Sequence, residues 1–383
     1  MFRSIFKLIK KKILFLFYLS MSDLSIIRGD KVKAIIFLQK LTNKAEVKDV
    51  IWWKLGKLLG AEGNWFEAKK AFLLALRINR RNPQYLYCLG KAEEIIGDSE
   101  DALRIYEKVL AHKSDCELTL FAKGNLLMKK GSFGDAVLCF YKLIPFQEKN
   151  PELHNNIGLC LMQLNNYELA ERFFQKAVIL KPKDTVYAYN YGLVMLKRGY
   201  YEKAIAILGK HLQEERAEIF SSLGYCYSSL GKYEESLQFY KKALLIAPYQ
   251  KENLVNLACI YARMGEHTKA LLILKKLLRV NPSDANLFNN IAWIYENLKN
   301  YWEAEKNYYR GIALAPKDPN LMYNLLCCLR KQNKYCEAME IIAVLKKIPE
   351  WRKLAWSSLA HIYEKMGEKT LAVDCYNKAL GLN

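Results

Sequence analysis

Apolar residues recur every three or four positions along almost the whole chain, in segments that Gly, Asn and Pro interrupt. Ile157, Leu161 and Leu164 mark one such face. This spacing is typical of amphipathic helices. The interruptions are regular, because the pattern repeats every 34 residues: most glycines fall at two fixed positions of the repeat, and all nine prolines fall near the junction between one repeat and the next. The pattern predicts pairs of helices, each pair joined by a short turn.

Ten copies of this repeat can be laid in register. They begin at residues 49, 83, 117, 151, 185, 217, 251, 285, 319 and 353, and only the step from 185 to 217 is shorter. Positions 8 and 20 are mostly Gly or Ala, which lets two helices approach closely, and position 24 is a large apolar residue that fills the space beside them. Gly or Asn at position 15 suits a left-handed turn residue. Pro at position 32 of four repeats ends the second helix.

This pattern resembles the tetratricopeptide repeat (TPR) family, whose motif runs Trp-x2-Leu-Gly-x2-Tyr and then Ala, Phe, Ala and Pro. One copy here is Trp52, Leu55, Gly56, Leu59, Ala68, Phe72 and Ala75. Another is Phe220, Leu223, Gly224, Tyr227, Ser236, Tyr240, Ala243 and Pro248. The resemblance covers residues 49–383. It implies an all-α fold, a right-handed superhelical solenoid of helix-turn-helix units.

The residues before the array divide into two segments. A degenerate capping repeat is expected over residues 15–48, since Gly29, Ala34 and Leu38 fall at positions 15, 20 and 24. Residues 1–14 form a basic amphipathic segment, and residues 1–48 carry eleven Lys or Arg against three Asp or Glu. Three interpretations stay open for residues 1–19: a helical lead-in to the first repeat, a helix resting on an anionic membrane surface, or a signal sequence or anchor.

The family resemblance implies that the first helix of each pair lines a concave groove, with positions 2, 5, 6, 9, 12 and 13 facing it. Position 6 holds the candidate ladder residues Asn156, Asn190, Asn256, Asn290 and Asn324. The candidate aromatic contacts are Trp53, Tyr87, Phe121, Tyr189, Tyr225, Trp293 and Tyr323. The candidate cations are Lys57, Lys91, Lys129, Lys197, Arg263, Arg330, Lys331 and Lys365. His361 is expected to face the groove as a polar contact.

These residue types suit a peptide ligand. A carboxamide can bond both groups of a peptide unit, and the row of Asn resembles the asparagine ladder of O-linked N-acetylglucosamine transferases. The alternative is that Asn at position 6 is simply common in this family. Aromatic faces with cations favour a partly acidic, partly apolar segment. Each of these residues alone could equally be a packing or solvated position.

Net charge and the motifs that are missing from the sequence restrict the class of function that we expect. The formal net charge of +20 favours an acidic partner. We find no phosphate-binding loop, no hydrolase or metalloprotease motif, and no metal-ligand spacing among the ten cysteines. The sequence therefore predicts no enzyme activity, no cofactor and no metal site. The cysteines are expected to be core residues in a reducing compartment, the cytoplasm, with peripheral contact at the inner membrane surface as a further expectation.

The expected function is a scaffold that binds partner peptides or proteins along a basic, aromatic, Asn-lined groove. The alternative is the regulatory or substrate-recruiting arm of a separately encoded enzyme, such as a glycosyltransferase in surface-polysaccharide assembly. Charge alone could also bind RNA, without sequence specificity. Richness in Lys, Ile, Asn and Tyr favours an AT-rich bacterial genome. The last repeat lacks an extra polar helix, so self-association through its uncovered face is also expected.

Overall fold

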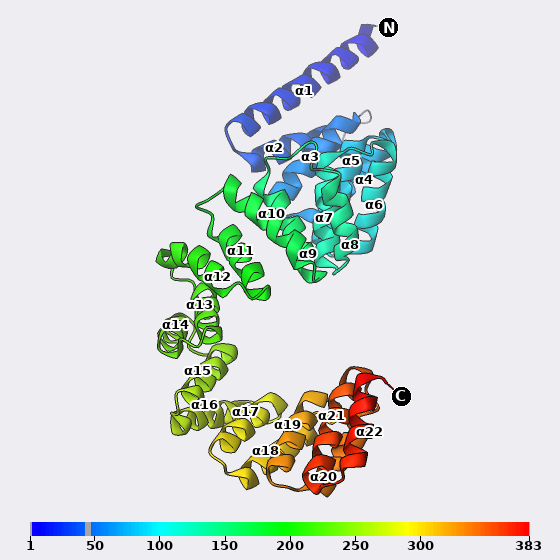
Figure 1. Ribbon diagram of the computed structural model, residues 1–383. Coiled ribbons are helices and arrows are strands. Elements are labelled where there is room, and N and C mark those ends of the chain that lie inside the picture. Colours follow the sequence, from blue (N-terminus) through cyan, green and yellow to red (C-terminus); the bar gives the residue numbers. More distant parts are fainter. Residues whose placement is uncertain (1, 43–46, 383) are drawn as a thin grey trace. The chain divides into compact units, whose positions relative to one another are not determined.

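The computed structural model describes residues 2–42 and 47–382, and in these residues every regular element is a helix (Figure 1). The chain divides after Arg198 into two compact units, here called the N-terminal unit and the C-terminal unit. Within each unit, consecutive helices pack on one another in chain order. The predicted all-α helical repeat is confirmed.

The N-terminal unit contains eleven described helices. They are α1 (Phe2–Ile27), α2 (Lys31–Thr42), α3 (Asp49–Ala61), α4 (Trp65–Ile78), α5 (Pro83–Ile96), α6 (Ser99–His112), α7 (Glu117–Lys129), α8 (Phe133–Tyr141), α9 (Pro151–Gln163), α10 (Tyr167–Leu180) and α11 (Thr185–Lys197).

The C-terminal unit continues the same order with one irregular element. It contains α12 (Tyr201–Leu208), the 3₁₀ helix η1 (Gly209–Glu214), α13 (Ala217–Ser229), α14 (Tyr233–Ile246), α15 (Lys251–Arg263), α16 (His267–Val280), α17 (Ala285–Asn297), α18 (Tyr301–Leu314), α19 (Pro319–Lys331), α20 (Tyr335–Leu345), α21 (Pro349–Met366) and α22 (Lys369–Leu380). The short α12 and η1 occupy the one repeat that the sequence shortens to 32 residues.

The turn inside each helix pair is set at position 15. All ten residues at that position have positive φ, and seven of them are glycines. The exceptions are Asn165, Lys299 and Asn333, with φ between 57° and 59°. A residue in the left-handed backbone conformation ends the first helix there, and the second helix then starts in the opposite direction.

Close helix approach explains the glycines at position 8. A Cβ placed on Gly124 would lie 2.6 Å from the Phe140 ring, and one on Gly158 would lie 2.7 Å from the Phe174 ring. Real Cβ atoms do not approach carbon that closely, so the small residue makes room for the position-24 ring. Phe140 and Phe174 are fully buried.

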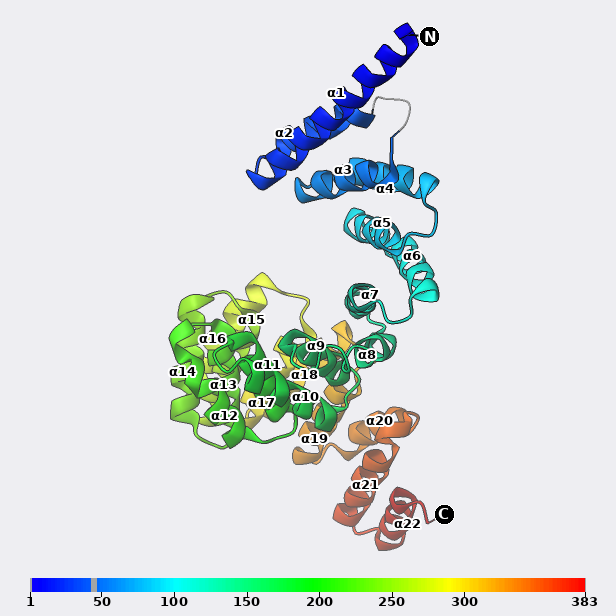
Figure 2. The same ribbon diagram turned by 90° about the horizontal axis from the view of Figure 1, so that it is seen from above.

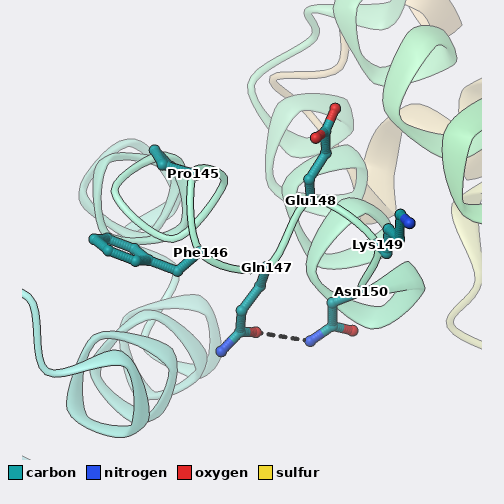
Figure 3. Close-up of a pocket in the computed structure, with 6 residues that line it drawn as sticks. All are labelled: Pro145, Phe146, Gln147, Glu148, Lys149 and Asn150. Carbon is teal, nitrogen blue, oxygen red and sulfur yellow. Dashed lines mark hydrogen bonds between the residues drawn. The ribbon is translucent and has the colours of Figure 1, made fainter.

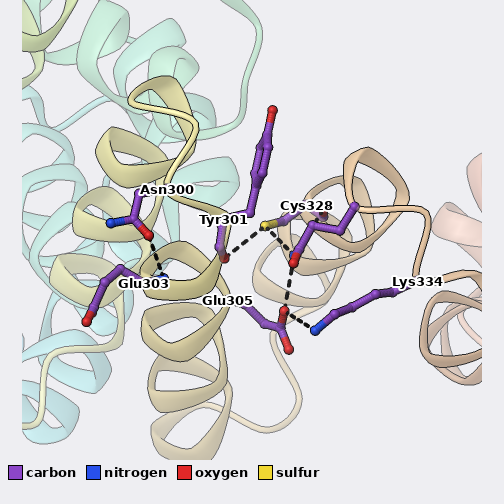
Figure 4. A network of polar contacts seen from close by, with 7 residues as sticks. Asn300, Tyr301, Glu303, Glu305, Cys328 and Lys334 are labelled. Atoms are coloured by element: carbon purple, nitrogen blue, oxygen red, sulfur yellow. Dashed lines mark hydrogen bonds and ion pairs between the residues drawn. The ribbon is translucent and has the colours of Figure 1, made fainter.

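Polar contacts also join one repeat to the next. Glu305 of α18 accepts a hydrogen bond from Lys334 at 2.8 Å (Figure 4). It also accepts one from Gln332 at 3.1 Å, and both donors lie in the turn of the following repeat. Arg198 and Glu171 form the corresponding ion pair in the N-terminal unit. At these two junctions, a carboxylate on the second helix of one repeat is joined to the turn of the next repeat.

The helix pair α1–α2 precedes the array (Figure 2). Within this pair, Gly29 has a φ of 76°, and Ala34 and Leu38 are fully buried. α1 runs without a break across the segment boundary expected at residue 14. No helix within the described residues is long and apolar enough to cross a membrane.

Candidate ligand-binding surface on the first helices

The first helices of neighbouring repeats form two continuous strips. The N-terminal strip consists of α3, α5, α7, α9 and α11, and the C-terminal strip consists of α13, α15, α17, α19 and α21. Direct helix contacts join most neighbours within a strip, and a hydrogen bond between Asn156 of α9 and Asn125 of α7 joins a further pair. All twenty candidate Asn, aromatic and cationic residues lie on these strips.

In the N-terminal strip, the ladder residues bond to other asparagines. Asn156 Nδ2 donates to Asn125 Oδ1 at 3.0 Å, and Asn190 Nδ2 donates to Asn155 Oδ1 at 2.8 Å. Asn156 and Asn190 are each only 8% exposed. Their main role in this structure is therefore to lock adjacent repeats together.

In the C-terminal strip, the ladder residues are more accessible. Asn324 Nδ2 donates to Asn289 Oδ1 at 2.8 Å, which repeats the pairing of the N-terminal strip. Asn256 donates to the hydroxyl of Tyr240, whose pKa is raised by burial. Asn256, Asn290 and Asn324 are all half-buried. A carboxamide has two donors and two lone pairs, so Asn256 and Asn324 each retain groups for a ligand beside these bonds.

The candidate aromatic side chains are held by packing. Ring centres lie 6.2 Å apart for Tyr87 and Tyr106, 5.8 Å for Phe121 and Phe140, 6.4 Å for Tyr225 and Tyr201, and 5.4 Å for Tyr323 and Trp351. Trp53 donates from Nε1 to the Cys88 sulfur at 3.3 Å. Tyr189 and Trp293 are half-buried. Contacts within the protein restrict the rotation of the packed rings, which lowers the entropy cost of binding a ligand.

Three of the candidate cations keep their charge available. Lys57 Nζ lies 4.6 Å from the Trp53 ring centre, so these two candidates form one cation–π pair. The Arg263 guanidinium lies 5.9 Å from the Tyr233 ring centre and donates to its hydroxyl at 3.4 Å. Lys197 is exposed.

Two further candidate cations, Lys91 and Lys129, are engaged by an acid that sequence reasoning missed. Glu94 accepts hydrogen bonds from Lys91 (3.2 Å), Lys129 (3.1 Å) and the Tyr106 hydroxyl (3.0 Å), and its side chain is 5% exposed. Burial alone would raise the pKa of Glu94, but these three donors outweigh it and the pKa is lowered.

The same arrangement recurs in the C-terminal strip. Glu296 accepts from the Tyr308 hydroxyl at 2.9 Å and from Lys331 at 2.7 Å. In both cases the carboxylate is at position 12, the tyrosine at position 24 of the same repeat, and the lysine at position 13 of the next. Part of the positive charge expected along the first helices is thus neutralised between repeats.

One hollow lies away from the strips. It measures about 570 Å³ and is lined by residues 145–150, in the loop after α8 (Figure 3). Asn150 donates to Gln147 at 2.8 Å and caps α9, while Gln147 donates to Glu117 at 2.8 Å. These polar groups hold the loop in place. In the residues that the structure describes, no group of His, Cys, Asp and Glu is placed to hold a metal ion.

Four family models match the chain, each described as a tetratricopeptide repeat. They match residues 151–184, 215–283, 273–306 and 354–383.

Curated relatives resemble parts of the chain. The BBSome complex member BBS4 of Bos taurus is 26% identical over 199 residues, which is 51% of this chain and 38% of that protein. A TPR repeat-containing protein of Methanocaldococcus jannaschii is 29% identical over 126 residues, 33% of this chain and 22% of that protein. The chain thus spans about two fifths or less of the length of these relatives.

Among solved structures, yeast Tom70 superposes with a TM-score of 0.52 over 97% of this chain and 93% of that one, at 15% identity. At that identity the likeness concerns the fold alone. The four family models and the repeated helix pairs identify the chain as a tetratricopeptide-repeat protein.

Proposed function

We propose that the chain is a non-catalytic scaffold that binds extended segments of partner proteins along its first-helix strips. Its TPR repeats and the BBSome relative favour a protein–protein interaction scaffold. The observation that carries the finer proposal is the set of half-buried carboxamides in the C-terminal strip. Asn324 there is fixed in place by its bond to Asn289.

A fixed carboxamide is suited to hold a peptide backbone. Its orientation is set by a neighbour within the protein, so less rotamer entropy is lost when a ligand binds. Asn256, Asn290 and Asn324 stand at the same position of three consecutive repeats, so a segment that crosses these repeats would meet them in turn. Because each contact is with the backbone, the strip would accept many sequences.

Neighbouring side chains would add selectivity. Tyr323 and Trp293 offer rigid aromatic surface beside the carboxamides, and Arg263 offers a charge that stacks on Tyr233. Aromatic and Arg residues dominate binding energy at protein interfaces. The preferred segment would therefore carry apolar and acidic residues, while Asn156 and Asn190 would serve to hold the N-terminal repeats together.

The test is partner capture from native cells after chemical crosslinking. A variant with Asn256, Asn290 and Asn324 replaced by Ala loses three hydrogen bonds, and we expect its affinity to fall at least about tenfold. The control variant has two other asparagines, Asn281 and Asn377, replaced by Ala; both lie outside the first helices. Circular dichroism checks that both variants stay helical.

Two results would count against this proposal. Unchanged capture by the triple variant, with helix content intact, removes the ladder from the binding site. A recovered partner with glycosyltransferase activity favours the alternative that the chain is the recruiting arm of a separate enzyme.

We also propose that α1 rests on an anionic membrane surface. Large apolar residues at helical spacing are exposed along it: Ile13 (63%), Leu16 (57%), Phe17 (50%), Leu24 (38%) and Ile27 (81%). In the sequence, five Lys or Arg precede this stripe within residues 1–12. An apolar stripe with cations beside it is the pattern of helices that lie in the headgroup region.

Vesicle sedimentation tests this proposal. We expect the chain to sediment with vesicles that contain phosphatidylglycerol, and much less with phosphatidylcholine alone. Replacing Leu16 and Phe17 by Ser should weaken binding at least about tenfold, since each buried side chain contributes about 1.5–3 kcal/mol. A control with Leu245 and Val280 replaced by Ser removes apolar residues that are more exposed than Leu16 and Phe17 but lie outside α1. Equal binding by both variants would refute a role for α1.

A further inference from the structure

The first helices of the last two repeats, α19 and α21, form the walls of a hollow that is lined by several cations. It measures about 420 Å³ and is lined by Cys327, Arg330, Lys331, Asn333, Tyr335, His361 and Lys365. α19 and the turn after it provide one wall, α20 contributes its first residue, and α21 provides the other wall. Three of the lining residues are permanent cations and none is a carboxylate. Its volume is within the range of small-ligand sites.

The hydrogen bonds already made inside the hollow leave mostly donors free. The Tyr335 hydroxyl donates to Asn333 Oδ1 at 2.7 Å, which occupies that acceptor and leaves the Asn333 amide N–H groups. The Nε atom of Arg330 is buried and has no hydrogen-bond partner. An unpartnered buried donor costs free energy, and a ligand that accepts from it would recover that cost.

The positive charge of the hollow is only partly balanced. Lys331 bonds Glu296 at 2.7 Å, and His361 lies 3.6 Å from Glu364. In the part of the chain that the structure describes, no ion pair joins Arg330 or Lys365 to an acid. Two cations and an amide donor therefore face the same space, which is the arrangement that an oxyanion requires.

We propose that this hollow is a subsite for an oxyanion, the carboxylate of an Asp or Glu side chain on a bound peptide. The inference rests on the proposed peptide-binding function and locates one contact within it. Tyr323 and Asn324 precede Cys327 on α19, and the Tyr323 ring lies 5.4 Å from that of Trp351. A segment held by the carboxamides and these rings would place an acidic side chain over Arg330 and Lys365. A phosphate on the same peptide offers the same chemistry.

Fluorescence anisotropy with the full chain can test the subsite directly. The probes are fluorescein-labelled peptides with four Glu between Gly-Ser linkers, the same peptide with Gln, and the same peptide with phosphoserine. The wild-type chain should bind the Glu peptide at least about tenfold more tightly than the Gln peptide, because charge-assisted bonds are the stronger ones. This preference should weaken as salt is raised.

Charge variants locate the site. Arg330→Gln and Lys365→Gln should each weaken binding of the Glu peptide about five- to tenfold and leave the Gln peptide unaffected. Lys276→Gln, an exposed residue of α16, removes the same charge from the same compact unit and should change nothing. Tighter binding of the phosphoserine peptide by the same residues would support the oxyanion site and assign phosphate as its occupant.

The outcomes separate this inference from the proposed function. If the wild-type chain does not distinguish Glu from Gln, or if Arg330→Gln, Lys365→Gln and Lys276→Gln behave alike, the subsite is wrong. Partner capture that still depends on the carboxamides would then leave the scaffold proposal standing. If the carboxamide variant also captures partners normally, both proposals fail.

Discussion

The bond between Tyr106 and Glu94 provides a sharp test of how the first helices are held. Tyr106 is fully buried, and its hydroxyl donates to Glu94 at 3.0 Å. Replacing Glu94 by Ala leaves that hydroxyl without a partner, which costs about 1–3 kcal/mol. Lys129 and Lys91 are 69% and 40% exposed at their side chains, so losing their ion pairs costs less than about 1 kcal/mol. The expected loss is about 2 kcal/mol in the free energy of unfolding.

A second substitution should recover part of this loss. Tyr106→Phe removes the hydroxyl, so the variant with both changes has no unpartnered group, and removing both partners of a hydrogen bond is close to neutral. We expect its loss to be smaller than the sum of the two single losses by about 1 kcal/mol or more. Lys129→Met is the control, with an expected loss below about 1 kcal/mol.

Urea unfolding at pH 7, followed by circular dichroism, measures these differences. The reasoning is refuted if Glu94→Ala costs no more than Lys129→Met. It is also refuted if the two losses simply add, because the carboxylate and the hydroxyl would then act independently.

Three further results are expected. Wild-type protein should be more stable than Glu94→Gln at pH 7, and this difference should fade as the pH falls below about 4. The reason is that the pKa of Glu94 is lower in the folded state than in the unfolded state, so its contribution to stability is lost as the pH falls through the folded-state pKa. Urea unfolding at several pH values measures the difference. Lys299→Gly should raise the free energy of unfolding by about 1 kcal/mol and Gly265→Lys should lower it by a similar amount, because both positions have positive φ. Thermal unfolding measures both, and a reversed order of the two midpoints would contradict this. Phe174→Ala should cost about 3–5 kcal/mol, and a loss under 1 kcal/mol would show that the ring does not hold the two helices apart.

The fold could be predicted from the sequence because each repeat position has a local physical cause. A left-handed turn favours Gly or Asn, so position 15 can be recognised in most repeats, and nine of its ten residues are Gly or Asn. A ring at position 24 needs a small partner at position 8, as Gly158 and Phe174 show. The residue type alone would not predict the positive φ of Lys299, which follows from the place of this residue in the repeat.

The candidate surface was less predictable, because its chemistry depends on contacts between repeats. Lys91 belongs to the predicted basic surface, yet it is paired with Glu94. The signal was present in the sequence as Glu at position 12, Tyr at position 24 and Lys at position 13 of the next repeat. The hollow at Arg330 and Lys365 depends on how α19 and α21 are placed, which residue spacing within one helix does not give.

Site-specific photocrosslinking in native cells tests the central claim, that partners bind along the first helices. A benzoylphenylalanine residue would replace Trp293 or Tyr323 on the C-terminal strip, or Tyr249 or Tyr309, which are exposed elsewhere. The account predicts that protein partners are crosslinked from positions 293 and 323 and not from 249 and 309. It also predicts that these crosslinks are lost when Asn256, Asn290 and Asn324 are replaced by Ala. Crosslinks from 249 and 309 alone, or crosslinks that survive the Asn replacements, would contradict it.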